Sequence, residues 1–303
     1  MHTEDFESSA SAIPPLRPNF GAWAITRRGS VYLIAASNRD LPVLTIAGSD
    51  PSGGAGIQGD LKTFAAHRVY GMAVITALTA QNTQEVTGVH AVPPAFVREQ
   101  LETLYKDIPW TAAKSGMLAN EEIVCEICDF YEKLNAPTHL VVDPVMVSST
   151  GARLLTEAAI DLYRTRLLSL TTIATPNHFE AEILAEMPIE SIKDQETAAR
   201  RIHQMGCKYV LVKGGDFQTD QTQVSDLWFD GNHATILTHP RETGESRHGT
   251  GCALSASIAA LLALGNPVPE AIKRARAYVL RGIQYAPQTG NGNKPIRHDQ
   301  SGI

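Results

Sequence analysis

The sequence predicts an α/β fold in which a mostly parallel sheet is covered by helices on both faces. Short β-branched runs alternate with segments of helical periodicity along most of the chain. The β-branched runs are almost continuously apolar, which is typical of strands buried on both faces. The helical segments between them are long enough to connect parallel strands, and such connections are right-handed.

The elements follow from these patterns in chain order. The expected strands are residues 43–47, 72–79, 139–145, 171–175 and 208–213. The expected helices are residues 57–68, 94–108, 121–134, 158–168 and 196–206, with a further helical run after Cys252. Because ligands bind at the carboxyl ends of parallel strands, we expect the functional residues in the loops that follow the strands.

The first 40 residues differ from the rest of the chain. They are rich in proline and contain one short apolar run, residues 31–36, which could add an edge strand. No Gly/Ser linker interrupts residues 42–285. We therefore expect an irregular N-terminal extension at residues 1–40 and one α/β domain at residues 41–303.

Composition excludes several classes of partner. With 26 Lys plus Arg against 32 Asp plus Glu, the net charge of −6 argues against binding to nucleic acid or to an anionic membrane. The longest apolar stretch, residues 252–264, is too short to span a bilayer. The acidic N-terminus resembles neither a secretory signal nor a transit peptide, and four cysteines are too few for a disulfide framework. These features predict a cytoplasmic protein.

Residues 54–59 read Gly-Ala-Gly-Ile-Gln-Gly, which formally matches a dinucleotide-binding motif. That motif requires a strand directly before the first glycine and an acid at the end of the next strand. The predicted strand ends near Ala47, and the next one ends in Ala80-Gln81-Asn82, so we reject a nicotinamide site. The remaining interpretations are a turn that approaches another ligand and a turn that is only structural.

A second glycine-rich segment, Gly249-Thr250-Gly251-Cys252, opens a helical run. Backbone N–H groups and the helix dipole at such a start stabilise an anion. Cys252 in the first turn would have a lowered pKa and could act as base or nucleophile. The alternative is an ordinary helix start with a small buried cysteine. Cys125 and Cys128 lie within a predicted amphipathic helix, so we interpret them as core residues and not as a metal site.

Carboxylates and a lysine follow three other strands. Asp143, Glu180 and the Lys213-Gly214-Gly215 turn would meet at one edge of the sheet. Mg²⁺ needs one or two carboxylates together with phosphates and waters. Taken alone, Asp143 is better explained by a turn before Pro144, and Glu180 by its place at a helix N-terminus. Taken together with the start of the helix at Cys252, the set predicts phosphoryl transfer.

Several segments resemble one known family. They are residues 45–63, 75–83, 114–118, 142–146, 175–180, 212–215, 248–252 and 290–296. In this order they resemble the hydroxymethylpyrimidine/phosphomethylpyrimidine kinases of thiamine biosynthesis, which belong to the ribokinase-like superfamily. The resemblance runs from about residue 42 nearly to the end of the chain. It implies a three-layer α/β/α fold and two successive phosphorylations of a small pyrimidine by ATP with Mg²⁺. It also suggests a homodimer.

The resemblance assigns expected roles to individual residues. Catalysis falls to Cys252 as the base, with Gly249 and Gly251 forming an anion hole. The substrate would be bound by Gln81, Gly48, Asp60, Met117 and Val145. ATP and its phosphates would be bound by Lys213, Asn177, Thr250 and Gly214. The metal would be held by Asp143 and Glu180.

Two alternatives stay open. Sugar kinases of this superfamily carry Asp at the position of Cys252, so the cysteine disfavours a sugar, but a pyridoxal or pyridoxine kinase is compatible with it. A second alternative is a catalytically silent protein that senses a thiamine precursor. The chain departs from the family pattern at Ser246-Arg247, where Asn-Thr is usual, and at Ala253, where Thr is usual. Arg247 would either contact phosphate or face solvent.

Overall fold

The computed structural model describes residues 24–27, 30–33, 41–134, 138–146, 155–215, 222–242 and 246–299. The chain divides into two compact units, Met1–Ala36 and Ser37–Ile303. In the first unit, β1 (Ala24–Arg27) pairs antiparallel with β2 (Ser30–Leu33) in a two-stranded sheet of their own. The described part of the apolar run at 31–36 therefore belongs to β2 and pairs with β1, and residues 34–36 lie outside the described residues.

The second unit is built on one sheet, which has nine strands in the described residues and the order β11-β10-β9-β8-β7-β6-β3-β4-β5. Six neighbouring strands are parallel, and β5, β10 and β11 run antiparallel to their neighbours. The mostly parallel sheet is therefore confirmed. The strands are β3 (Pro42–Ser49), β4 (Tyr70–Gln81), β5 (Val86–Ala91), β6 (Ala112–Ser115), β7 (His139–Val142), β8 (Ile173–Ala174), β9 (Tyr209–Val212), β10 (Gln223–Phe229) and β11 (Ala234–Pro240).

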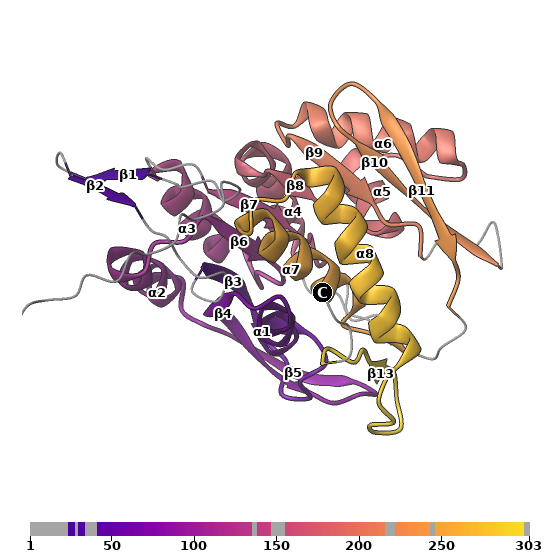
Figure 1. The fold of residues 1–303 in the computed structure, drawn as a ribbon, viewed down its shortest axis with the longest axis horizontal. Coiled ribbons are helices and arrows are strands. Elements are labelled where there is room, and N and C mark those ends of the chain that lie inside the picture. Colours follow the sequence, from indigo (N-terminus) through magenta and orange to yellow (C-terminus); the bar gives the residue numbers. More distant parts are fainter. Residues whose placement is uncertain are drawn as a thin grey trace, which may run out of the picture. The chain divides into compact units, whose positions relative to one another are not determined.

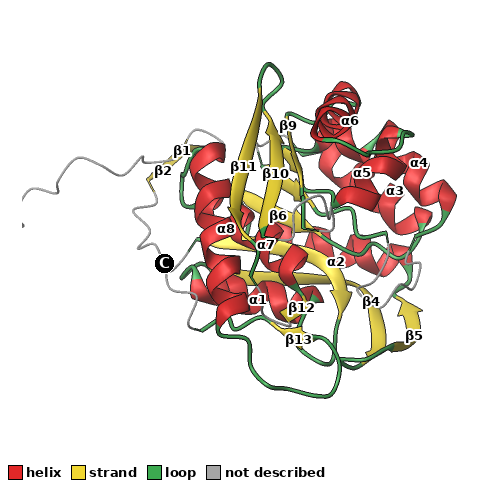
Figure 2. Cartoon of the chain, turned by 90° about the vertical axis from the view of Figure 1, so that its right-hand side faces the viewer, coloured by secondary structure: helices red, strands yellow, loops and turns green. Residues whose placement is uncertain are grey.

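Helices cover both faces of this sheet (Figure 1). One face carries α1 (Gly56–Ala66), α7 (Thr250–Ala263) and α8 (Val268–Gln284). The other carries α2 (Pro94–Asp107), α3 (Glu121–Glu132), α4 (Glu157–Thr165), α5 (His178–Ala185) and α6 (Ile192–Gln204), together with the 3₁₀ turn Leu167–Leu170. Figure 2 shows the strands between these two sets of helices.

The two-sided burial follows from the period of the strands. In β7, Leu140 and Val142 pack under α2–α6, whereas Val141 between them packs under α1, α7 and α8. Successive side chains of a strand point to opposite faces, so an uninterrupted apolar run fills two cores at once. Cys128 and Cys207 lie in the core under α2–α6, which confirms the structural interpretation of Cys128.

The strand order fixes where a ligand can bind. From β3 the chain passes through α1 to β4 on one side of β3, and it later returns to β6 on the other side. The carboxyl ends of β3 and β6 therefore lie at a topological switch point, where open α/β sheets form a crevice. In the described part of the chain, no helix has the length and apolar character needed to cross a membrane.

Candidate active site

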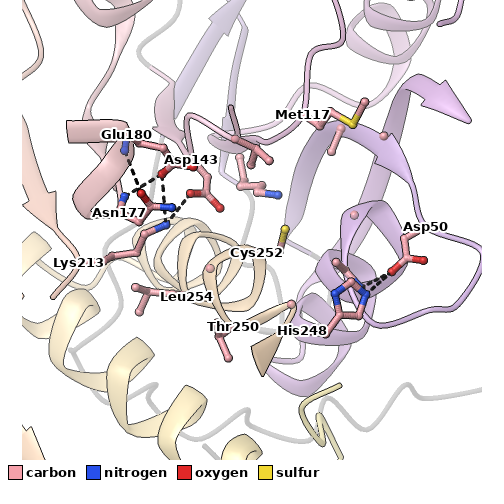
Figure 3. Close-up of a pocket in the computed structure, with 18 of the residues that line it drawn as sticks. Asp50, Met117, Asp143, Asn177, Glu180, Lys213, His248, Thr250, Cys252 and Leu254 are labelled. Carbon is pink, nitrogen blue, oxygen red and sulfur yellow. Dashed lines mark hydrogen bonds and ion pairs between the residues drawn. The ribbon is translucent and has the colours of Figure 1, made fainter. Parts of the chain in front are cut away.

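A cavity of about 740 Å³ opens at the carboxyl ends of the central strands (Figure 3). Loops after β3, β6, β7, β8 and β9 line it, together with the end of β4, the start of β5 and the first turns of α5 and α7. It brings together twelve of the fourteen residues predicted from the sequence. These are Gly48, Gln81, Met117, Asp143, Val145, Asn177, Glu180, Lys213, Gly249, Thr250, Gly251 and Cys252.

Two helix N-termini meet at this cavity because glycines allow close approach. Gly249, the residue before α7, has φ +81°, and a Cβ there would lie 1.9 Å from the carbonyl oxygen of Gly54. Gly56, the first residue of α1, has φ +55°, and a Cβ there would lie 2.4 Å from the carbonyl oxygen of Gly48. Both glycine-rich segments thus press against neighbouring backbone and direct N–H groups at the cavity.

The two turns are joined by a buried pair that the sequence analysis did not identify. His248 Nε2 lies 2.8 Å from Asp50 Oδ2, and both side chains line the cavity (Figure 3). Asp50 also accepts hydrogen bonds from the N–H groups of Ser52 and Ala55. Burial alone would raise the pKa of Asp50, but the bonds from His248 and Ser52 lower it to about 2. Asp50 is therefore a permanent carboxylate that fixes the turn between β3 and α1.

Acidic groups and a lysine form a cluster at the opposite side of the cavity. Lys213 Nζ lies 2.9 Å from Asp143 Oδ1 and 3.9 Å from Glu180 Oε2, and the two carboxylate side chains are 3% and 5% exposed. Burial raises the pKa of Glu180 to about 7, although the Lys213 cation opposes the rise. Glu180 also forms a capping box with Asn177 at the start of α5, so it has a structural role as well.

The donor set of this cluster fits Mg²⁺. The described residues hold no group of three or more His, Cys, Asp or Glu side chains that could bind a metal alone. Mg²⁺ instead takes one or two carboxylates and completes its shell with phosphates and waters. Gly251 leaves room beside Asp143, because a Cβ at this glycine would lie 3.5 Å from Asp143 Oδ2 and 3.2 Å from Lys213 Nζ. Asp143 and Glu180 would hold the ion.

One end of the cavity is lined by residues at the end of β4. Thr79 Oγ1 lies 3.0 Å from the carbonyl oxygen of Ser49 and 3.2 Å from Gln81 Oε1. Met117 and Val145 line the same cavity, and Gly48 lies close to Met117, since a Cβ at this glycine would be 3.2 Å from the Met117 sulfur. An amide beside apolar walls suits a flat heteroaromatic ring.

Asp60 does not line the cavity, contrary to the prediction. Its carboxylate is fully buried, and its Oδ2 accepts hydrogen bonds from Lys114 Nζ at 2.8 Å and Thr45 Oγ1 at 2.6 Å. Burial raises the pKa of Asp60, with the Lys114 cation opposing the rise. Lys114 itself lines the cavity and was not predicted as a site residue, although it opens a segment that resembles the family. Asp60 thus lies behind the cavity wall, paired with Lys114.

Gly214 also lies outside the cavity lining. Its N–H donates to Asp226 Oδ1 at 2.8 Å, and a Cβ there would lie 1.9 Å from the carbonyl oxygen of Ser225. The backbone is therefore turned towards β10, and the neighbouring Gly215 lines the cavity instead.

Arg276 of α8 was not predicted; it lines the cavity and pairs with Asp226. The side chain of Arg247 lies outside the described residues.

Cys252 stands in the first turn of α7, as predicted, but its pKa differs from the prediction. Burial raises the pKa of the thiol to about 11, while the Lys114 cation and a backbone hydrogen bond with Gly56 act in the opposite direction. Desolvation therefore outweighs the Lys114 cation and the Gly56 hydrogen bond, and the expected lowering of the pKa is wrong.

Comparison with known proteins identifies the family. The family described as phosphomethylpyrimidine kinase matches residues 50–297. The chain belongs to this family. A hydroxymethylpyrimidine/phosphomethylpyrimidine kinase of Synechococcus elongatus is 45% identical over 84% of this chain and 96% of its own length. A thiamine biosynthesis bifunctional protein of Geobacter sulfurreducens is 42% identical, and there the chain spans only 52% of the relative's length.

Solved structures agree with a kinase fold. A phosphomethylpyrimidine kinase of Clostridium difficile superposes with a TM-score of 0.70 and 40% identity, covering 79% of this chain and 98% of the other. A pyridoxal kinase of Staphylococcus aureus in complex with ADP superposes with a TM-score of 0.79 and 36% identity, covering 86% and 94%. This likeness confirms the ribokinase-like three-layer α/β/α fold expected from the sequence for this member of the phosphomethylpyrimidine kinase family.

Proposed function

We propose that this kinase transfers the γ-phosphoryl group of ATP to 4-amino-5-hydroxymethyl-2-methylpyrimidine and then to the resulting monophosphate, in thiamine biosynthesis. One observation carries the proposal beyond family membership. A single cavity holds an amide beside apolar walls, two helix N-termini, a cysteine at one of them and a lysine–carboxylate cluster. Those are the groups that binding a pyrimidine and moving a phosphoryl group require.

Each group has a role in the proposed reaction. Gln81 binds a ring nitrogen and the exocyclic amine of the pyrimidine. The N–H groups at Gly249, Thr250 and Gly251 stabilise the negative charge on the transferring group. Lys213 binds the phosphates of the nucleotide, assisted by Asn177.

The remaining groups carry the proton and the metal. Cys252 accepts the proton of the acceptor hydroxyl; with a thiol pKa of about 11, its basic form is a minor species at neutral pH in the protein without substrate. Held by Asp143 and Glu180, Mg²⁺ would neutralise charge on the phosphate oxygens.

A pyridoxal kinase is the second candidate. It is favoured by the likeness to the Staphylococcus aureus enzyme, which is also known in complex with AMP-PCP and pyridoxal. Both substrates are flat heteroaromatic rings that carry a hydroxymethyl group. The homodimer and the cytoplasmic location expected from the sequence stay predictions.

Turnover with three separate acceptors tests the proposal. We expect ADP formation with the aminopyrimidine alcohol and with its monophosphate, and a kcat/KM for pyridoxal at least about tenfold lower. Cys252→Ala serves as the control: it should lower kcat by about a hundredfold and change substrate KM little, because a base acts mainly in the transition state. Comparable kcat/KM for pyridoxal would favour the second candidate, and binding without ADP formation would favour a silent sensor.

A further inference from the structure

The segment of residues 290–296, which we call the C-terminal strap, connects two parts of the cavity wall. At its first end it packs on the turn that follows Gln81. The N–H of Gly292 donates to Thr83 Oγ1 at 3.1 Å, and the N–H of Asn293 donates to the carbonyl oxygen of Thr83 at 2.8 Å. In Figure 1 this part of the chain, drawn in yellow, lies beside the hairpin of β4 and β5.

At its second end the strap packs beside the phosphate-binding turn. Its strand β13 (Lys294–Pro295) pairs in parallel with β12 (Ser246–His248), which ends directly before Gly249 (Figure 2). Pro295 also approaches the other glycine-rich turn, because a Cβ at Gly54 would lie 3.1 Å from Pro295 Cβ. The next residue, Ile296, is only 3% exposed and packs in the core under α1, α7 and α8.

The contact with Thr83 depends on glycine. A Cβ at Gly290, which has φ +70°, would lie 2.3 Å from Thr83 Oγ1, and a Cβ at Gly292 would lie 2.0 Å from the carbonyl oxygen of Thr83. Any larger residue at these positions must push the strap and the turn apart, since the obstacle at Gly292 is backbone.

We infer that the C-terminal strap positions the acceptor against the phosphoryl group by holding the turn at Thr83 at a fixed distance from the turn at Gly249. The inference rests on the proposed function, in which Gln81 binds the acceptor and Gly249 begins the anion site. Gln81 is two residues from Thr83, and it lies at the end of a hairpin at the edge of the sheet. A displacement of about 1 Å between two reacting groups can lower a rate about a hundredfold, so such a link has kinetic consequences.

Gly292→Ala tests the strap, with Gly88→Ala as the matched control. Gly88 lies on β5 of the same hairpin, and a Cβ there would make an ordinary contact of 3.7 Å with Ala80. For Gly292→Ala we expect the KM for the pyrimidine to rise at least about tenfold and kcat to fall, with the KM for ATP changed less than about twofold. Gly88→Ala should match the wild type. Equal kinetics in the two variants would overturn the inference.

A second pair of variants separates positioning from general stability. Thr83→Val removes the hydroxyl that Gly292 N–H donates to, whereas Thr83→Ser keeps it. We expect the pyrimidine KM to rise in the first variant and to return towards the wild-type value in the second. Parallel changes in the KM for ATP, the KM for the pyrimidine and the melting temperature would indicate a merely structural segment and would overturn the inference.

Hydrogen exchange makes the test independent of the substrate. In Gly292→Ala, amides of residues 82–92 should exchange faster than in Gly88→Ala, while those of α3 on the far core should be unchanged. Equal exchange at 82–92 would overturn the inference whatever the acceptor is. Wild-type protein that fails to phosphorylate the pyrimidine would instead overturn the proposed function, leaving the exchange result to decide on the strap.

Discussion

At the scale of a single side chain, opposing effects set the pKa of the Cys252 thiol. It lies at a helix N-terminus beside the Lys114 cation, which both favour a thiolate, yet burial raises its pKa to about 11. Asp60 and Asp143 add to the rise through their negative charge. At neutral pH the protein without substrate therefore holds Cys252 mainly as a neutral thiol.

Alkylation of Cys252 by iodoacetamide, followed by peptide mass spectrometry, tests this thiol. Because only the thiolate reacts, we expect the rate to rise about tenfold per pH unit from about pH 7 to 9.5 without a plateau. Cys125, which is half-buried on α3, is an internal reference in the same digest, and Cys252→Ala identifies the peptide. A plateau below pH 8 would contradict the raised pKa.

Sequence alone locates most residues of the site but not all of them. Asp143, Glu180 and Lys213 were placed at one edge because each follows a parallel strand, and the structure brings them within ion-pair distance. Asp60 and Gly214 were misplaced because their orientation depends on partners far away in the chain, Lys114 and Asp226. Asp50 and His248 are separated by almost two hundred residues in the sequence, so no local sequence pattern predicts that they pair.

The elements were predicted where they are buried on both faces. The five expected strands overlap β3, β4, β7, β8 and β9, which belong to the parallel part of the sheet, but three of them, 139–145, 171–175 and 208–213, are predicted too long. The antiparallel strands β5, β10 and β11 were missed because one of their faces is more exposed and carries polar residues, which breaks the apolar run. β6 was missed because Ala112–Ser115 contains no β-branched residue.

The start of α7 depends on Gly249, which gives a prediction at the element scale. In Gly249→Ala the new Cβ would collide with the backbone of Gly54, so α1 and α7 must separate. Gly265→Ala is the control: Gly265 has φ +80°, almost the same as Gly249, but no atom lies within 4 Å of its Cβ position. Both variants lose about 1–2 kcal/mol from the left-handed backbone. Only Gly249→Ala should also lower kcat, by about a hundredfold.

Urea unfolding and steady-state kinetics check this pair of variants. A fall in kcat that is equal in Gly249→Ala and Gly265→Ala would show that backbone strain, and not separation of the two helix starts, is responsible.

Across the whole molecule, two buried histidines couple stability to pH. The His67 ring bonds Ser257 of α7 and contacts the Tyr278 ring of α8 at a tilt of 47°, and His298 bonds the Tyr278 hydroxyl. Burial lowers the pKa of each histidine to about 4. The unfolded chain takes up these protons near pH 6.5 and the folded chain only near pH 4. The stabilisation is therefore complete above pH 6.5 and is lost as the pH falls towards 4.

We expect the free energy of unfolding to fall by about 1–3 kcal/mol per histidine between pH 6.5 and pH 4. His67→Gln should make this dependence shallower, measured by urea titrations at several pH values. His233→Gln, at a side chain that is 83% exposed, should leave the slope of the wild type. If the free energy of unfolding of His67→Gln depends on pH as steeply as that of the wild type, groups other than His67 cause the loss of stability in acid.

The buried pair of Lys114 and Asp60 restricts how this cavity can change its substrate over evolutionary time. Replacing either partner alone leaves a buried charge without its counter-ion, at a cost of about 3–5 kcal/mol. A single substitution at Lys114 or Asp60 is therefore expected to destabilise the protein before a second substitution can compensate. A relative that lacks one of the two residues should therefore lack the other as well, so we expect Lys114 and Asp60 to be kept or replaced together.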